Sequence, residues 1–129
     1  PDGKTLYVAD TEGARRWAVD IEAPGRGRAK AGFAPHCGRV IAGLEGPARF
    51  DSLAGLASDN IAVGTLNTGY ITEISPAGEI VRAVKMPDSY PTNICFGDED
   101  MRTAYVTLSE TGRLARLRWP EPGLKLNFN

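Results

Sequence analysis

The sequence predicts an all-β fold, built as part of a β-propeller. Three units of one pattern follow one another along the 129 residues, and each consists of a short strand, a hairpin turn with glycine and a second strand. The second strands alternate apolar and polar residues with a period of two, as half-buried antiparallel strands do. A repeat of ~40–45 residues with about four strands per unit indicates propeller blades.

The three hairpins carry this repeat. They join segments 6–11 and 16–22, 61–65 and 70–74, and 104–108 and 113–119. The glycines of the second and third hairpins, Gly69 and Gly112, are 43 positions apart, whereas Gly13 and Gly69 are 56 apart. We attribute the extra length to Pro24–Pro35, a Gly/Pro-rich segment with basic residues. It is predicted to be an exposed, mobile loop inserted into the first unit.

The remaining segments complete the blades. Outer strands are expected at 39–42 and 80–84, and innermost strands at 53–57 and 93–96. In the first unit Pro1-Asp2-Gly3 aligns with the turn Ser58-Asp59-Asn60, so we expect the chain to begin after that innermost strand. The predicted domain is thus a single partial propeller of about three four-stranded blades, at 1–48, 49–88 and 89–129.

Three blades are too few for a closed propeller, which typically has four to eight. Upstream blades, another chain or a second copy are therefore expected to close the ring. In the last case the third blade of one copy would lie against the first blade of the other, around a two-fold axis along the channel. Apolar residues such as Trp17, Val19 and Ile21 would be left bare in an isolated chain.

Composition excludes several function classes. The net charge of −1 gives no nucleic-acid footprint, and no apolar run approaches membrane-spanning length, so neither partner is expected. Cys37 and Cys95 fit no metal or redox spacing. We interpret Cys95 as a small buried hydrophobe, which favours a reducing compartment and predicts a cytoplasmic protein.

The candidate site lies where the innermost strands begin. Asp51 stands just before the apolar run 53–57, next to Ser52, while Thr92 and Asn93 hold the same place in the next blade. Convergent oxygen ligands from separate blades suit a hard cation such as Ca²⁺ or Mg²⁺. The alternatives are plainer: Asp51 as a turn former, and Thr92 and Asn93 as caps that bond a turn backbone. A Ser-His-Asp triad on His36, the only histidine, has no other support in the sequence.

An ordered set of motifs resembles the SMP-30/gluconolactonase/LRE-like family, over essentially the whole chain. The matching segments are 1–11, 16–20, 50–54, 91–97 and 102–107, with 111–114, 118–120 and 122–124 resembling the end of bacterial members.

The resemblance implies the C-terminal half of a six-bladed propeller that hydrolyses sugar lactones or related esters with one divalent cation. Asp51 matches a metal ligand that is also the favoured general base, and the family's other ligands, a Glu and an Asn, belong upstream. Calcium is the first choice of metal, with zinc, manganese or magnesium as alternatives. Thr92 and Asn93 are assigned to substrate binding. A non-catalytic half-propeller that serves as a binding or interaction module is the alternative function.

Overall fold

The computed structural model describes residues 2–28 and 38–126, and within them the chain forms antiparallel sheets. The strands are β1 (Thr5–Asp10), β2 (Arg15–Ala23), β3 (Arg26–Gly27), β4 (Arg39–Gly43), β5 (Arg49–Gly55), β6 (Ile61–Leu66), β7 (Tyr70–Ile74), β8 (Ile80–Lys85), β9 (Pro91–Gly97), β10 (Thr103–Leu108) and β11 (Arg113–Arg118).

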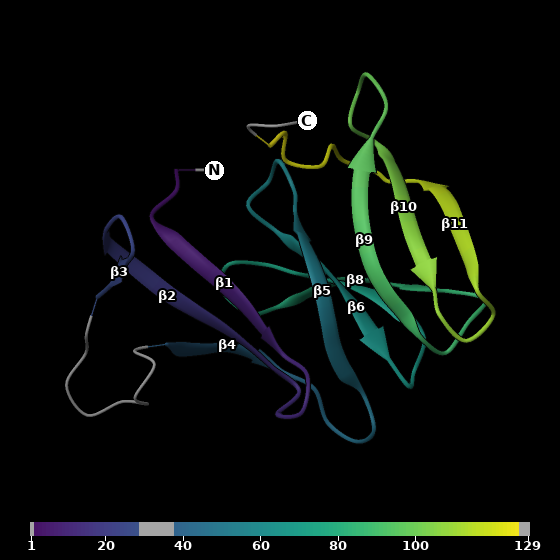
Figure 1. Ribbon diagram of the computed structural model, residues 1–129, viewed down its shortest axis with the longest axis horizontal. Helices are drawn as coiled ribbons and strands as arrows, with labels where there is room; N and C mark the ends of the chain where they lie inside the picture. Colours follow the sequence, from purple (N-terminus) through teal and green to yellow (C-terminus); the bar gives the residue numbers. More distant parts are fainter. Residues whose placement is uncertain (1, 29–37, 127–129) are drawn as a thin grey trace.

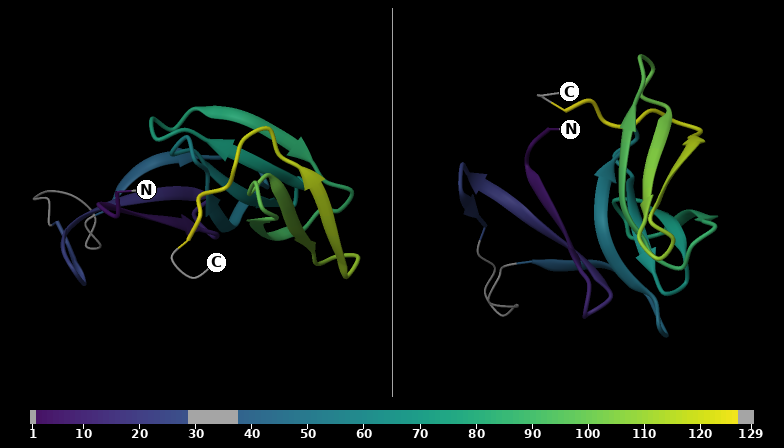
Figure 2. Two further views of the ribbon diagram at one scale, coloured as in Figure 1. Left: turned by 90° about the horizontal axis from the view of Figure 1, so that it is seen from above. Right: turned by 45° about the vertical axis from the view of Figure 1, so that its right-hand side comes forward.

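Three sheets lie side by side in chain order, with the second between the first and the third (Figures 1 and 2). In the first sheet β2 pairs with β1, β3 and β4; the second runs β5-β6-β7-β8; the third runs β9-β10-β11. The predicted all-β architecture of three blades is confirmed. The third sheet has three strands rather than four in the described part of the chain.

Two apolar layers hold the sheets together. Phe50, Val63 and Ile74 form the layer between the first and second sheets, together with Ala9 and Ala42. A larger layer joins the second and third sheets and includes Leu56, Ile71, Ile94, Phe96, Val106 and Trp119. The middle sheet is therefore covered on both faces, which explains why β6 reads as a continuous apolar run instead of an alternating one.

The first sheet buries the face that looks more polar in the sequence. Arg16 and Ala18 on β2 are almost fully buried against the second sheet. The Arg16 guanidinium donates hydrogen bonds to the carbonyl oxygens of Ile74 (3.1 Å) and Ser75 (2.9 Å) and lies 5.0 Å from the ring centroid of Tyr7. Burial lowers the pKa of Arg16. The apolar side of β2 consequently faces away from the other two sheets.

Cys95 is exposed, so its prediction as a buried hydrophobe is wrong. The register of β9 places Ile94 and Phe96 toward the second sheet, and the residue between them must point to the opposite side. The exposed thiol removes the argument that linked this cysteine to a reducing compartment.

The segment after β11 crosses back over the ends of β9 and β5 (Figure 1). It is fixed by backbone hydrogen bonds: Gly123 donates to Met101 (2.7 Å), Leu124 donates to Gly55 (2.9 Å), and Ala57 donates to Pro122 (2.9 Å). This segment, Pro120–Leu126, thus ties the third sheet to the second at the end of β5 farthest from Asp51.

The predicted inserted loop, Pro24–Pro35, is only partly described. Its first residues make the turn into β3, which pairs with β2 through Ala23 and Ile21. Residues 29–35 lie outside the described part of the chain, so the predicted mobility stays a prediction. Across the ranges 2–28 and 38–126, no helix has the length and apolarity needed to span a membrane.

The Asp88 carboxylate links the loop before β9 to the β10–β11 hairpin by hydrogen bonds. We therefore expect the stability of the fold to fall in acid. Burial pushes the pKa of its carboxyl upward, but hydrogen bonds from the backbone of Tyr90 and from Thr111 outweigh it and hold the pKa below the ordinary value. A depressed pKa stabilises the folded state above about pH 4, and this contribution is lost as the pH falls through the folded pKa.

We expect Asp88→Asn to be less stable than the parent at about pH 7, with the difference shrinking toward about pH 3 because the parent loses the contribution that the variant lacks. Urea midpoints at the two pH values measure it. An equal gap at both would show that ionisation of Asp88 contributes nothing.

Candidate active site

Asp51 lies inside β5, since the strand begins at Arg49 rather than after Asp51. The pairing of β5 with β6 is regular at Phe50↔Thr65 and again at Leu53↔Val63, with a shift of register between them. Asp51 and Ser52 together therefore oppose the single residue Gly64, which is a β-bulge. Bulges re-aim side chains and are frequent beside functional sites.

Gly64 brings the next inner strand against this bulge. A methyl group on Gly64 would overlap the carbonyl oxygen of Pro91, the first residue of β9. The beginnings of β5 and β9 thus meet at Gly64. Thr92 and Asn93 follow Pro91 within β9, at the same end of the sheets as Asp51, and they do not lie in a turn.

The carboxylate of Asp51 is half-buried, and it has neither a hydrogen bond nor an ion pair with any described residue. The Thr92 hydroxyl is 2.9 Å from that of Thr107 on the neighbouring strand, and Asn93 is exposed. An acidic oxygen without a protein partner among the described residues is a ligand type that suits a hard cation, and Thr92 and Asn93 carry further oxygen atoms at the same end of the sheets. Within the described ranges no three His, Cys, Asp or Glu side chains gather in a way that would hold a metal ion.

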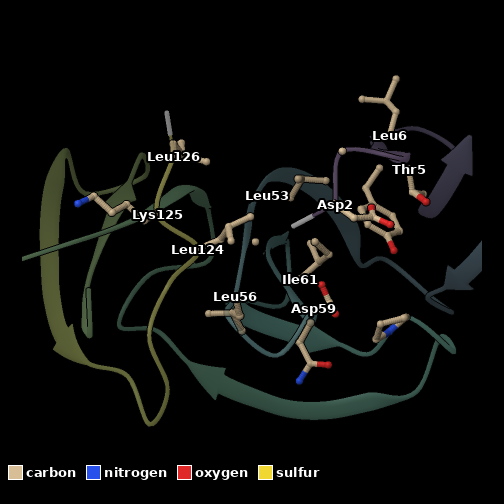
Figure 3. A pocket seen from close by; sticks show the side chains of 15 residues that line it. Asp2, Thr5, Leu6, Leu53, Leu56, Asp59, Ile61, Leu124, Lys125 and Leu126 are labelled. Atoms are coloured by element: carbon tan, nitrogen blue, oxygen red, sulfur yellow. The ribbon is translucent and has the colours of Figure 1, made fainter. Parts of the chain in front are cut away.

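A cavity of about 720 Å³ lies at the opposite end of β5 (Figure 3). Its walls are β1, the end of β5, the turn at Asp59 and Asn60, and the C-terminal segment at Leu124–Leu126. Asp51 is not among its lining residues. The predicted site and this cavity are therefore separate places.

The sequence-based prediction missed Gly64, although a signal was present. A glycine inside an otherwise apolar strand often marks close approach of another backbone, and Gly64 interrupts the run from Ile61 to Thr65 in this way. His36 lies outside the described residues, so the triad alternative is not addressed by the structure.

Gly64→Ala should destabilise the chain by about 1–3 kcal/mol, because the added methyl group must displace the Pro91 backbone. Gly43→Ala is the matched control. A methyl group there would lie 3.7 Å from the Ala14 carbonyl oxygen, an ordinary contact, on a strand that pairs with β2 alone among the described strands. Urea denaturation of both variants compares them. Equal stabilities would contradict the close approach of β9 to β6.

Several known proteins are similar to this chain. A 6-deoxy-6-sulfogluconolactonase from Pseudomonas putida is 37% identical over 57 residues, which are 43% of this chain and 20% of that protein. Among solved structures, a luciferin-regenerating enzyme matches with a TM-score of 0.70 at 23% identity, over 84% of this chain and 34% of that one. Regucalcin from Agrobacterium tumefaciens, described as a calcium-binding protein, matches with a TM-score of 0.73 at 20% identity, over 98% and 47%.

The structural matches show the fold: three sheets of a propeller. This chain spans less than half the length of each of these proteins. The family model of the SMP-30/gluconolactonase/LRE-like region matches residues 1–110. On that match, which covers most of the chain, the protein belongs to the SMP-30/gluconolactonase/LRE-like family.

Proposed function

We propose that this chain forms part of a complete propeller that hydrolyses a sugar lactone or a related ester with the help of one divalent cation. The observation that carries the proposal is the half-buried, unpartnered carboxylate of Asp51 on the bulge of an inner strand. Membership of the family and similarity to a protein named as a sulfogluconolactonase support the same class of substrate.

Asp51 has two roles in this proposal. Its carboxylate would hold the cation together with oxygen ligands from further blades, and it would accept a proton from the attacking water. A divalent cation bound there supplies Lewis-acid polarisation of the lactone carbonyl. Calcium is our first choice because the oxygen donors are hard and regucalcin, a structural match, is described as calcium-binding.

Thr92 and Asn93 would orient the substrate from the neighbouring blade. The side chain of Asn93 is exposed, so its amide can donate to a sugar hydroxyl and accept from one. The Thr92 hydroxyl is already engaged by Thr107, which fixes its direction. Thr92 and Asn93 lie near the start of β9, and β9 packs against Gly64 opposite the bulge that holds Asp51. This position supports their assignment to substrate binding.

The test is a lactonase assay on a complete propeller, with the additional blades joined to these residues in one chain or supplied as a second chain. We expect turnover of a sugar lactone that is abolished by a chelator and restored by Ca²⁺, Mn²⁺ or Zn²⁺. Turnover that is insensitive to chelation, or no turnover with any of these cations, would contradict the proposal.

A non-catalytic binding module is the second candidate, and one observation favours it for this chain alone. The first sheet exposes apolar side chains, among them Leu6 and Val40, on the face turned away from the other sheets. Such surface is typical of interaction sites. A complete propeller that binds the cation but leaves lactones intact would support this alternative.

A further inference from the structure

Tyr90 presents an exposed aromatic ring from the loop that precedes β9. Its side chain is 40% exposed, and among the described residues it is the only aromatic one in the set of exposed large apolar side chains. The Tyr90 hydroxyl has no hydrogen bond with any described residue. Both the ring and the hydroxyl are therefore open to a ligand.

The path of this loop places Tyr90 beside the candidate site. Residues 86–90 run from β8, the outermost strand of the second sheet, to β9, the innermost strand of the third. Tyr90 is the last residue of the loop and directly precedes Pro91, whose carbonyl group lies against Gly64. Gly64 in turn opposes the bulge that holds Asp51. Because consecutive Cα atoms are about 3.8 Å apart, Tyr90 lies at the end of the inner strands where Asp51 is found.

Hydrogen bonds hold the backbone of the loop at Tyr90. The Tyr90 amide donates to the Asp88 carboxylate at 2.7 Å, and the Tyr90 carbonyl oxygen accepts from the amide and the hydroxyl of Ser109 at 3.0 and 3.3 Å. The amide of Ser89 donates to the Glu110 carboxylate at 3.1 Å. The Tyr90 side chain is thus presented by a backbone that is already ordered, so binding through it requires little further ordering of the loop.

The chemistry of a tyrosine side chain matches that of a sugar lactone. A sugar lactone ring has a face of C–H groups and hydroxyl groups around its edge. The face of the tyrosine ring is apolar, and its hydroxyl both donates and accepts hydrogen bonds. Ligand pockets combine such aromatic walls with a small number of polar groups.

We propose that Tyr90 is a further substrate-binding residue, whose ring packs on the C–H face of the lactone while the lactone carbonyl is held near Asp51. This inference rests on the proposed function, since it assigns a contact for the same substrate. The contact is remote from the carbonyl that is attacked, so it has the same strength in the ground state and in the transition state. Loss of such a contact raises KM and leaves kcat unchanged.

The first test is steady-state hydrolysis of glucono-δ-lactone by the complete propeller and its variants. We expect Tyr90→Ala to raise KM roughly tenfold with kcat within about threefold of the parent, and Tyr90→Phe to keep KM within about threefold because the ring remains. Ile80→Ala is the matched control, because Ile80 is 57% exposed on β8, the outermost strand, and it should behave as the parent does. Circular dichroism and melting check that all three variants fold.

The second test measures binding without turnover. Its probe is anhydroglucitol, an uncharged sugar ring that lacks the lactone carbonyl, and its Kd is obtained by ligand-observed NMR. We expect Tyr90→Ala to raise this Kd at least about fivefold and Ile80→Ala to leave it unchanged. Because the probe cannot be hydrolysed, this measurement does not depend on lactonase activity.

The two tests separate this inference from the lactonase proposal. An active propeller in which Tyr90→Ala leaves KM unchanged overturns the role of Tyr90 and leaves the lactonase proposal standing. An inactive propeller whose binding of anhydroglucitol is weakened by Tyr90→Ala contradicts the lactonase proposal and supports the contact of Tyr90 with a sugar ring. A loss confined to kcat, equal losses in Tyr90→Ala and Tyr90→Phe, or binding of anhydroglucitol that is absent or insensitive to Tyr90→Ala also overturns the role of Tyr90.

Discussion

Replacing Asp51 by asparagine in the complete propeller is expected to lower lactone turnover by on the order of 10³-fold or more. Asparagine keeps the shape of the side chain but loses the negative charge that would hold the cation and the basicity that would accept a proton. Because Asp51 has no hydrogen-bond or ion-pair partner among the described residues, the substitution should leave the fold intact. Steady-state kinetics and thermal melting measure the two effects separately.

Asp59→Asn is the matched control, because Asp59 occupies the turn between β5 and β6, at the opposite end of the same strand. Its φ of 70° is a backbone conformation that asparagine adopts readily, so we expect near-parental stability and turnover within a few-fold of the parent. Near-native turnover of Asp51→Asn would remove Asp51 from the catalytic site. Equal losses in both variants would indicate a general effect of acidic residues around the channel.

Phe50→Ala is expected to destabilise the chain by about 3–5 kcal/mol, which is a large part of the stability of a domain. Phe50 is fully buried in the layer between the first and second sheets, against Val63 and Ile74, so its removal leaves a cavity between two blades. Because Phe50 immediately precedes the bulge, its loss should also loosen the placement of Asp51. Equilibrium denaturation in urea gives the size of the effect.

Leu114→Ala serves as the control for Phe50→Ala, since it removes a large apolar side chain that is 65% exposed on the third sheet. We expect it to change the free energy of unfolding by less than about 0.5 kcal/mol. A cost for Phe50→Ala as small as that for Leu114→Ala would mean that the first and second sheets do not pack as described.

The strands were predictable because the pattern that specifies them is local. The segment 70–74 is β7 at its predicted bounds, and the predicted hairpin strands match β1, β2, β6, β10 and β11 to within one residue at either end. The alternation of apolar and polar residues and the glycine of the turn both lie within the few residues of each hairpin. The innermost strand β5 was misplaced at its start, because Arg49 and Asp51 are polar and do not resemble a strand that faces a channel.

The faces of the sheets were less predictable, because which side is buried depends on neighbouring blades. On β2 the sequence predicted that Trp17, Val19 and Ile21 need a neighbouring blade to cover them, but it did not predict that Arg16 and Ala18 form the buried side, with Arg16 bonded to carbonyl groups on the second sheet. Cys95 was assigned to the core for the same reason. Its register depends on β10, and composition alone does not contain that information.

The sequence names candidate residues for the site, but their geometry was not predictable from it. The family motif around Asp51 identified the acid, while the bulge that aims it arises from the register shift opposite Gly64. Gly64, opposite the bulge, lies against Pro91 of another blade, and local sequence patterns do not specify such a tertiary contact.

A crystal structure of the complete propeller grown with Mn²⁺, with anomalous scattering used to locate the cation, tests directly whether Asp51 is a metal ligand. We expect one strong anomalous peak at the start of the inner strands, at roughly 2.0–2.6 Å from a carboxylate oxygen of Asp51. Crystals of Asp51→Asn grown under the same conditions should lack that peak. A cation bound elsewhere in the channel without contact to Asp51, or equal peaks in the parent and the variant, would show that Asp51 is not a metal ligand.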